Sequence, residues 1–140
     1  LLGLSELMLK MRDFDNIVEL AKGGDLSRID LTIGDISKEQ VSVFTDDITA
    51  SNFGKVSDLA TRNDIALGIV NMVFQTIGMM AVFAARSVGA SYIVLTGNLT
   101  AVPQAPELFA VLQRLTGLRF TLPEHAEFAT ALGAALTGLT

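Results

Sequence analysis

The chain has 140 residues, of which 50% are hydrophobic, so it is long enough to bury one sizeable core and one domain is expected. Its net charge of -5 comes without any run of Lys and Arg, so nucleic acid is not an expected partner and a basic surface for anionic membrane is missing. With no Cys and a single His, the sequence excludes disulfide frameworks, thiol nucleophiles and the commoner zinc sites, and it is compatible with the reducing cytosol.

The beginning of the chain predicts two short helices and a strand. Residues 4–10 have helical composition, and Asp13 is a suitable N-cap for a second helix that ends at Gly23-Gly24. Apolar residues then alternate over residues 29–36, which indicates a strand with one buried face. Residues 37–47 are polar, so we expect a loop there. The chain opens with Leu1-Leu2-Gly3-Leu4, without Met and without a charged region before an apolar stretch, which is typical neither of a signal peptide nor of a natural start. We therefore expect the chain to be a fragment.

One long helix is predicted over residues 64–88, and residues 65–85 carry no charge. This stretch meets the length of roughly 20 residues that a membrane span requires, so a membrane-inserted fragment is one alternative. Asn71, Gln75 and Thr76 argue against a span, as does the absence of Trp or Tyr beside the flanking charges. We therefore expect a buried helix in the core of a layered domain and no membrane partner.

The second half of the chain alternates strands and helices. The run at residues 92–95 predicts a strand that leads into a turn at Thr96-Gly97-Asn98, and Pro106 suits the start of a helix that Gly117 ends. A short strand over residues 119–122 and an Ala-rich helix over residues 123–139 follow. This order is typical of an α/β domain with helices packed on a small sheet.

The least ordinary segment is residues 47–54, Asp-Ile-Thr-Ala-Ser-Asn-Phe-Gly, where small and hydroxylated residues crowd together. One interpretation is that Thr49 or Ser51 caps the helix that follows. The other is a pocket whose hydroxyls and backbone amides hold a polar small molecule. Composition alone favours the helix cap.

Two other segments invite a functional interpretation. Gly97-Asn98 follows the end of a strand, where ligands bind in open α/β sheets, although a turn that needs a positive φ explains the pair equally well. The pair Glu124-His125 suggests a general base, but a carboxylate near a helix N-terminus and a His without partners favour a structural role. Scattered Asp residues define no metal site, and no Gly-rich phosphate loop is present.

Taken in order, these segments resemble the type II, eukaryotic-like (fumble) pantothenate kinases over nearly the whole chain. The opening Leu1-Leu2-Gly3-Leu4 looks like the segment after the family's Gly-Gly-Gly-Thr loop, and residues 47–54 are similar to its Gly-Asp-Leu-Thr-Ala-Ser-Ser-Phe-Gly. Further segments match the family in the same order. They are Gly24-Asp25 through Ile29-Asp30 and Gly34-Asp35-Ile36, Ile77-Gly78 with Ala81, Gly97-Asn98, and Glu124-His125 through Leu132-Gly133-Ala134.

The resemblance implies that residues 1–140 are the C-terminal lobe of a two-lobe kinase: a ribonuclease-H-like lobe of the acetate and sugar kinase/actin fold. It implies phosphorylation of pantothenate by ATP with Mg²⁺, a homodimer and a cytoplasmic location. By the same resemblance Thr49, Ala50 and Ser51 contact pantothenate, Ile48 crosses to the partner in the dimer, and Gly97 and Asn98 lie beside the nucleotide.

The family's phosphate loop, catalytic Glu and substrate-clamping Arg would all precede Leu1, so we assign no catalytic residue here and expect the isolated chain to be inactive. Some residues depart from the family's pattern: Asp46, Ala126 and Thr130 replace glycines, and Gln75-Thr76 stands where paired Asn is common. The family's pocket aromatics are not evident. A homologue that has lost catalysis and acts as a dimerisation or regulatory partner is therefore the alternative. A lobe without its mate should also self-associate through exposed apolar surface.

Overall fold

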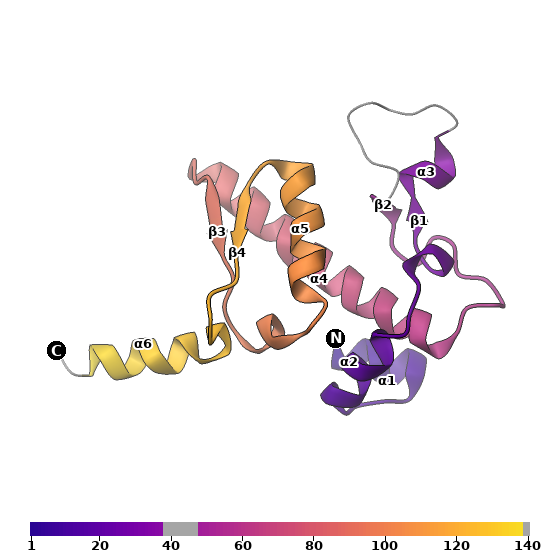
Figure 1. The fold of residues 1–140 in the computed structure, drawn as a ribbon, viewed down its shortest axis with the longest axis horizontal. Coiled ribbons are helices and arrows are strands. Elements are labelled where there is room, and N and C mark those ends of the chain that lie inside the picture. Colours follow the sequence, from indigo (N-terminus) through magenta and orange to yellow (C-terminus); the bar gives the residue numbers. More distant parts are fainter. Residues whose placement is uncertain (38–47, 139–140) are drawn as a thin grey trace. The chain divides into compact units, whose positions relative to one another are not determined.

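A computed structural model describes residues 1–37 and 48–138, which form a helix-rich α/β structure with two small sheets (Figure 1). The chain divides into two compact units, Leu1–Val73 and Phe74–Thr140, and the division falls inside the long helix α4 (Arg62–Ser87). Each unit contains one of the two sheets.

The first unit opens with the two predicted helices, α1 (Leu2–Leu9) and α2 (Phe14–Ala21). Asp13 caps α2 as predicted, because its carboxylate accepts a hydrogen bond of 2.9 Å from the backbone N–H of Asn16. A single 3-10 turn, η1 (Leu26–Arg28), follows the glycine pair. Apolar side chains of α1, α2, Ile29 and the first half of α4 form the core of this unit: Leu9, Ile17, Val18, Ala21, Ile29, Ala66, Ile69 and Val70.

The strand predicted over residues 29–36 is wrong for most of its length. Only β1 (Leu31–Thr32) is extended, and it pairs antiparallel with β2 (Thr49–Ser51). The short helix α3 (Ile33–Ile36) follows because Thr32 and Asp35 form a capping box, in which each side chain accepts a hydrogen bond from the other residue's backbone N–H. The loop predicted over residues 37–47 lies, after Ser37, outside the described residues.

The long helix is confirmed and begins two residues earlier than predicted, at Arg62. Thr61 and Asp64 cap it reciprocally: Asp64 accepts hydrogen bonds of 2.8 Å from the N–H and hydroxyl of Thr61, and its own N–H donates to that hydroxyl. By length and composition α4 is apolar enough to cross a membrane, but 44% of its most apolar window is buried within the described structure. The core helix of a soluble protein meets the same criteria.

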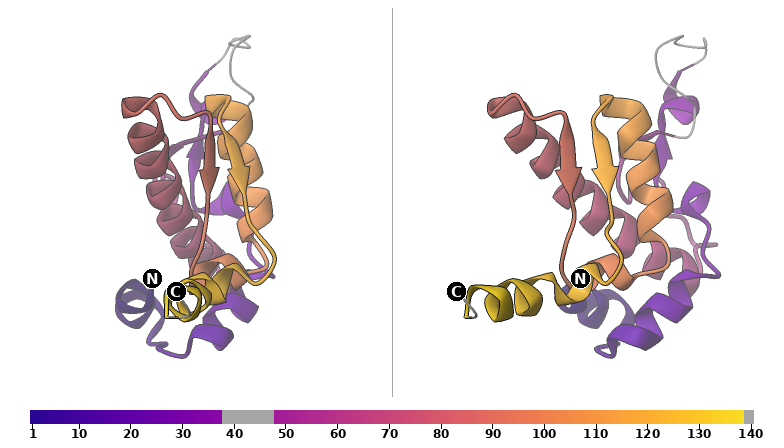
Figure 2. Two further views of the ribbon diagram at one scale, coloured as in Figure 1. Left: turned by 90° about the vertical axis from the view of Figure 1, so that its left-hand side faces the viewer. Right: turned by 60° about the vertical axis from the view of Figure 1, so that its left-hand side comes forward.

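The second unit contains a parallel strand pair, β3 (Tyr92–Val94) and β4 (Arg119–Thr121), which Figure 2 shows side by side. Helix α5 (Ala105–Thr116) connects them and ends at Gly117, which takes the left-handed conformation as expected. Parallel strands need such a crossover connection. The second half of α4 and α5 pack against each other so closely that a Cβ at Gly78 would lie 2.1 Å from a Leu112 methyl carbon.

The final helix begins later than predicted. Residues 123–125 form a turn, closed by a hydrogen bond of 3.3 Å from the Ala126 N–H to the Pro123 carbonyl, and His125 has a φ of 57°. The 3-10 helix η3 (Ala126–Phe128) and helix α6 (Ala129–Thr137) come next. A residue with a left-handed backbone cannot continue a right-handed helix, so the start predicted at Pro123 is wrong. The predicted end at Leu139 lies outside the described residues.

Candidate functional site

The segment predicted to contact pantothenate is a strand in the first unit. Thr49, Ala50 and Ser51 form β2, and the carbonyl of Ile48 accepts a hydrogen bond of 2.9 Å from the Ile33 N–H. The helix-cap interpretation is therefore wrong, since α4 begins only at Arg62 and Thr61 caps it. Ala50 and Ser51 are exposed, whereas Ile48 and Thr49 are half-buried.

A tight turn ends this strand. The Gly54 N–H donates to the Ser51 carbonyl at 3.2 Å, and Phe53 has a left-handed φ of 57°. A Cβ at Gly54 would lie 2.9 Å from side-chain atoms of Leu31 and Ser51, so only glycine fits there without a shift of these neighbours. Asp47, the first residue of the predicted segment, and Asp46 before it lie outside the described residues.

A buried carboxylate holds the turn in place. Asp30 is fully buried; one of its oxygens accepts a hydrogen bond of 2.8 Å from the Phe53 N–H, and the other accepts one of 2.7 Å from the Asn71 side-chain amide of α4. Burial raises the pKa of Asp30, and the hydrogen bonds from Phe53 and Asn71 oppose that rise. No sequence pattern pointed to this pair.

Charged groups lie near the same strand. Lys55 contacts the Asp35 carboxylate at 2.5 Å, and this hydrogen bond is the main reason that the pKa of Asp35 falls to about 2. Lys55 also lines a cavity of about 500 Å³ together with Ser27, Arg28, Ser57 and Leu59. Both cations are paired with carboxylates, because Arg28 lies 3.6 Å from Asp25. The cavity therefore has little free positive charge to offer an anion.

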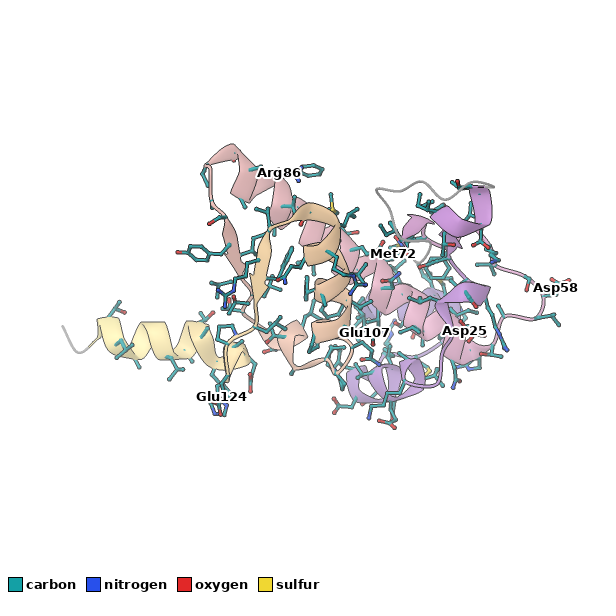
Figure 3. The ribbon with its side chains drawn as sticks, turned by 45° about the horizontal axis from the view of Figure 1, so that its top comes forward. Asp25, Asp58, Met72, Arg86, Glu107 and Glu124 are labelled. Atoms are coloured by element: carbon teal, nitrogen blue, oxygen red, sulfur yellow. The ribbon has the colours of Figure 1, made fainter. Side chains whose placement is uncertain are left out.

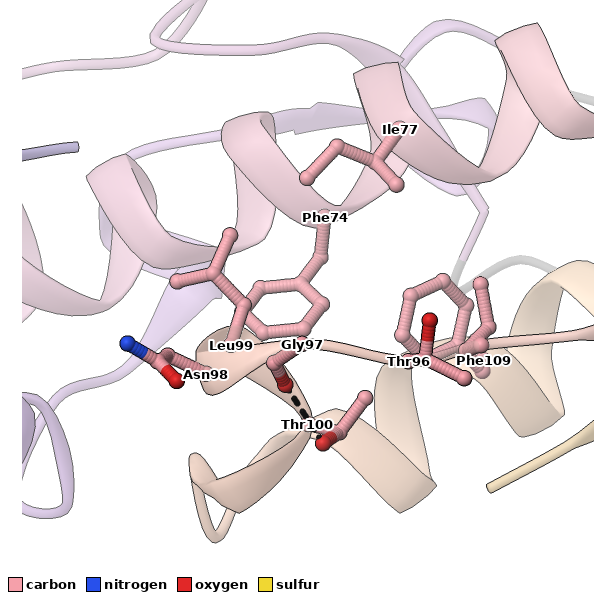
Figure 4. Close-up of a pocket in the computed structure, with 9 residues that line it drawn as sticks. Phe74, Ile77, Thr96, Gly97, Asn98, Leu99, Thr100 and Phe109 are labelled. Atoms are coloured by element: carbon pink, nitrogen blue, oxygen red, sulfur yellow. Dashed lines mark hydrogen bonds between the residues drawn. The ribbon is translucent and has the colours of Figure 1, made fainter. Parts of the chain in front are cut away.

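The turn after β3 lines a cavity of about 310 Å³ in the second unit (Figure 4). Gly97 has a φ of 101°, its N–H donates to the Ala126 carbonyl at 2.9 Å, and its carbonyl accepts the Thr100 hydroxyl at 2.7 Å. Asn98 follows as the first residue of η2 (Asn98–Ala101). The remaining lining is Phe74, Ile77, Leu95, Thr96, Leu99, Thr100 and Phe109.

Aromatic rings form one side of this cavity. The rings of Phe74 and Phe109 meet edge to face at 5.3 Å, and Phe109 stacks on Phe120 at 5.4 Å. Phe74 and Ile77 of α4 and Phe109 of α5 were not predicted as lining residues, because apolar residues of a helix are usually core positions. The cavity thus combines an aromatic wall with two threonine residues and one asparagine residue, Thr96, Thr100 and Asn98.

The sequence-predicted residues fall into two groups. Ile48, Thr49, Ala50 and Ser51 belong to the first unit, and Gly97 and Asn98 belong to the second. The pair Glu124-His125 is exposed on the turn before η3, where Figure 3 labels Glu124, and its side chains lie 3.5 Å apart. Within residues 1–37 and 48–138, no group of three or more acidic, His or Cys side chains could hold a metal ion.

Comparison with known proteins places this chain. Proteins named type II pantothenate kinase match it from Oceanobacillus iheyensis (31% identity, 98% of this chain and 53% of the relative), Staphylococcus haemolyticus (31%, 94% and 52%) and Staphylococcus aureus strain MRSA252 (29%, 97% and 53%). The chain spans about half the length of these curated relatives. The resemblance to type II pantothenate kinases is therefore confirmed. Since the Fumble family model matches residues 1–137, the chain belongs to the Fumble family.

Proposed function

We propose that the complete protein is a pantothenate kinase that transfers the γ-phosphate of ATP to the 4′-hydroxyl of pantothenate, the first step of coenzyme A biosynthesis. One observation carries this proposal: the chain matches a protein named type II pantothenate kinase along 98% of its length. The product is 4′-phosphopantothenate.

The substrate side of the site is the strand β2. Pantothenate carries a carboxylate, an amide and hydroxyls, so it needs donors and acceptors that approach closely. Thr49 and Ser51 supply hydroxyls on one face of β2, and the small Ala50 leaves the backbone accessible from the opposite face. Ile48 reaches the partner's site in a homodimer.

The nucleotide side of the site is the turn at Gly97-Asn98. An aromatic wall beside polar side chains suits a ligand with an apolar face and a polar edge, such as the nucleoside part of ATP. Gly97 has a positive φ, its N–H is bound to the Ala126 carbonyl, and its carbonyl accepts both the N–H and the hydroxyl of Thr100. Asn98 therefore provides the side-chain amide at this rim.

The fold proposal is that residues 1–140 are a ribonuclease-H-like C-terminal lobe of an actin-type kinase. The parallel pair β3 and β4 joined by α5 supports an α/β lobe of this kind. A homodimer agrees with the exposure of large apolar side chains on α4, where Met80 is 66% and Phe83 is 62% exposed. A net charge of -5 and the burial of 44% of the most apolar window of α4 agree with a cytoplasmic protein that needs neither nucleic acid nor a membrane.

We assign the residues that carry out phosphoryl transfer to a part of the protein outside this chain. Phosphoryl transfer rests on a phosphate loop, a base for the attacking hydroxyl and positive charge around the phosphates. The described residues contain no carboxylate cluster that fits the expected Mg²⁺, so none of them is assigned as a metal ligand in the reaction. The isolated chain of 140 residues is expected to be inactive.

The alternative function is a homologue without catalysis that acts as a dimerisation or regulatory partner. It rests on the replaced glycines, of which Ala126 is the most informative. Ala126 is 3% exposed and its carbonyl still binds the Gly97 N–H, so this replacement keeps the nucleotide-side turn tied in place. The kinase is therefore the better supported of the two functions.

Mass-spectrometric detection of 4′-phosphopantothenate from ATP and pantothenate distinguishes these proposals. The complete protein is expected to form the product, and the isolated chain is expected to form none. Failure of the complete protein would refute the kinase and favour the non-catalytic homologue. Product from the isolated chain would refute the assignment of the chemistry to another part of the protein.

A further inference from the structure

Asp30 is the one buried carboxylate that joins the candidate substrate strand to α4 within the described residues. It precedes β1, and its two oxygens bind the Phe53 N–H at 2.8 Å and the Asn71 amide at 2.7 Å. Asp64, the other buried carboxylate among these residues, caps α4 instead. A carboxylate away from water is expensive unless its oxygens are satisfied, so the two bonds are needed for Asp30 to stay where it is.

The Asp30 bonds act on a strained turn. Phe53 has a left-handed φ of 57°, a conformation that costs a bulky residue energy and persists only where neighbours enforce it. The N–H of Phe53 is held by Asp30, and its ring packs on α4 at Gly68, where a Cβ would lie 3.1 Å from the ring. The turn that ends β2 is therefore fixed from its backbone and from its side chain.

The position of the turn sets the direction of the substrate strand. Gly54 donates to the Ser51 carbonyl, and the N–H of Lys55 donates to the Ile29 carbonyl at 2.9 Å, so the turn starts at the last residue of β2 and ends beside Asp30. A loss of the Asp30 bonds would free the Phe53 N–H and loosen the turn, so that Ser51 would be held mainly by its pairing with Leu31 of β1. The last residue of β2 would then be positioned less firmly.

We propose that Asp30 is a positioning residue, which through Phe53 and Asn71 fixes the β2 end so that Thr49 and Ser51 face pantothenate. The inference rests on the proposed function, because β2 is taken there as the substrate strand. Asp30 does not touch the substrate. Its effect is on pantothenate binding and not on the nucleotide side, whose residues lie in the other compact unit.

The test uses the complete protein and exchanges the carboxylate and the amide between positions 30 and 71. In Asp30→Asn, one oxygen still accepts the Phe53 N–H, but the new amide faces the Asn71 amide, donor against donor, unless Asn71 turns its oxygen towards position 30 and changes its other contacts. Adding Asn71→Asp restores a donor and an acceptor. Asp13→Asn is the matched control, since it makes the same chemical change at an exposed helix cap that asparagine also serves.

Michaelis constants for pantothenate and ATP are measured well below each variant's melting temperature. Misplacement of Thr49 and Ser51 is expected to raise the pantothenate KM of Asp30→Asn by about tenfold, with a change of less than about twofold for ATP. The double variant is expected to recover most of the loss, and Asp13→Asn to resemble the parent protein. Amide hydrogen exchange at Phe53 should follow the same order, being fastest in Asp30→Asn.

Three results would overturn the proposal. They are an unchanged pantothenate KM in Asp30→Asn, an equal rise of both Michaelis constants, and a rise that the double variant does not reduce although its Phe53 amide is protected again. If Asp30→Asn does not fold, Asn71→Ala gives the same comparison, since it removes one donor and leaves the Phe53 bond. A parent protein without pantothenate kinase activity would instead refute the proposed function.

Discussion

Replacing Gly78 by alanine tests the close packing of α4 on α5. A Cβ at Gly78 would lie 2.1 Å from a methyl carbon of Leu112 and 3.4 Å from the Phe109 ring. Leu112 is 4% exposed and has little room to move, so overpacking is expected to cost about 1–3 kcal/mol. Alanine also favours the helix by about 1 kcal/mol over glycine, which offsets part of this cost. The net loss of unfolding free energy is about 0–2 kcal/mol.

Gly133 in α6 supplies the control, because no atom lies within 4 Å of a Cβ built there. Gly133→Ala therefore changes helix propensity alone, and its unfolding free energy should be about 1–3 kcal/mol above that of Gly78→Ala. Urea unfolding followed by circular dichroism measures both values. A Gly78→Ala protein at least as stable as Gly133→Ala would show that α5 does not pack on α4 in this way.

The remaining predictions concern charge and association. Burial raises the pKa of Asp64, but hydrogen bonds from Thr61 and Asp25 together outweigh it and lower this pKa below 3.8. The stability that Asp64 contributes is therefore present above pH 3.8 and is lost as the pH falls below it. Thr61→Ala should lower the free energy of unfolding by about 1 kcal/mol. In thermal melts this variant should lose less stability in acid than the parent protein does. Lys55→Ala should raise the pKa of Asp35 from about 2 towards 3.8 in a carboxyl NMR titration, and an unchanged value would contradict the ion pair. Phe83→Asp should reduce self-association in sedimentation experiments, and unchanged association would move the interface elsewhere.

The helices could be predicted because their signals are local. Asp13 marks the start of α2 and Gly117 marks the end of α5, each through contacts within one helical turn. The uncharged run of residues predicts α4. The strand predicted over residues 29–36 was wrong because the prediction gave the alternating apolar residues more weight than the capping box at Thr32 and Asp35. The residues of that capping box are visible in the sequence. A local hydrogen-bonding motif decided the structure there.

The candidate site could be predicted only in part. Thr49, Ser51, Gly97 and Asn98 were assigned by resemblance, and the structure adds what surrounds them. Asp30 and Asn71 are 41 residues apart, and no periodicity or short motif reports a hydrogen bond over that separation. Such contacts arise only once α4 packs beside β1, so they depend on the tertiary fold.

We propose that this chain carries a pantothenate side at β2 and a nucleotide side at the turn after β3. Steady-state kinetics of the complete protein with Ser51→Ala and Asn98→Ala would separate the two sides. We expect Ser51→Ala to raise the KM for pantothenate and leave that for ATP nearly unchanged, and Asn98→Ala to do the reverse. If both variants change the same constant, or neither changes any, the division of the site into these two sides is contradicted.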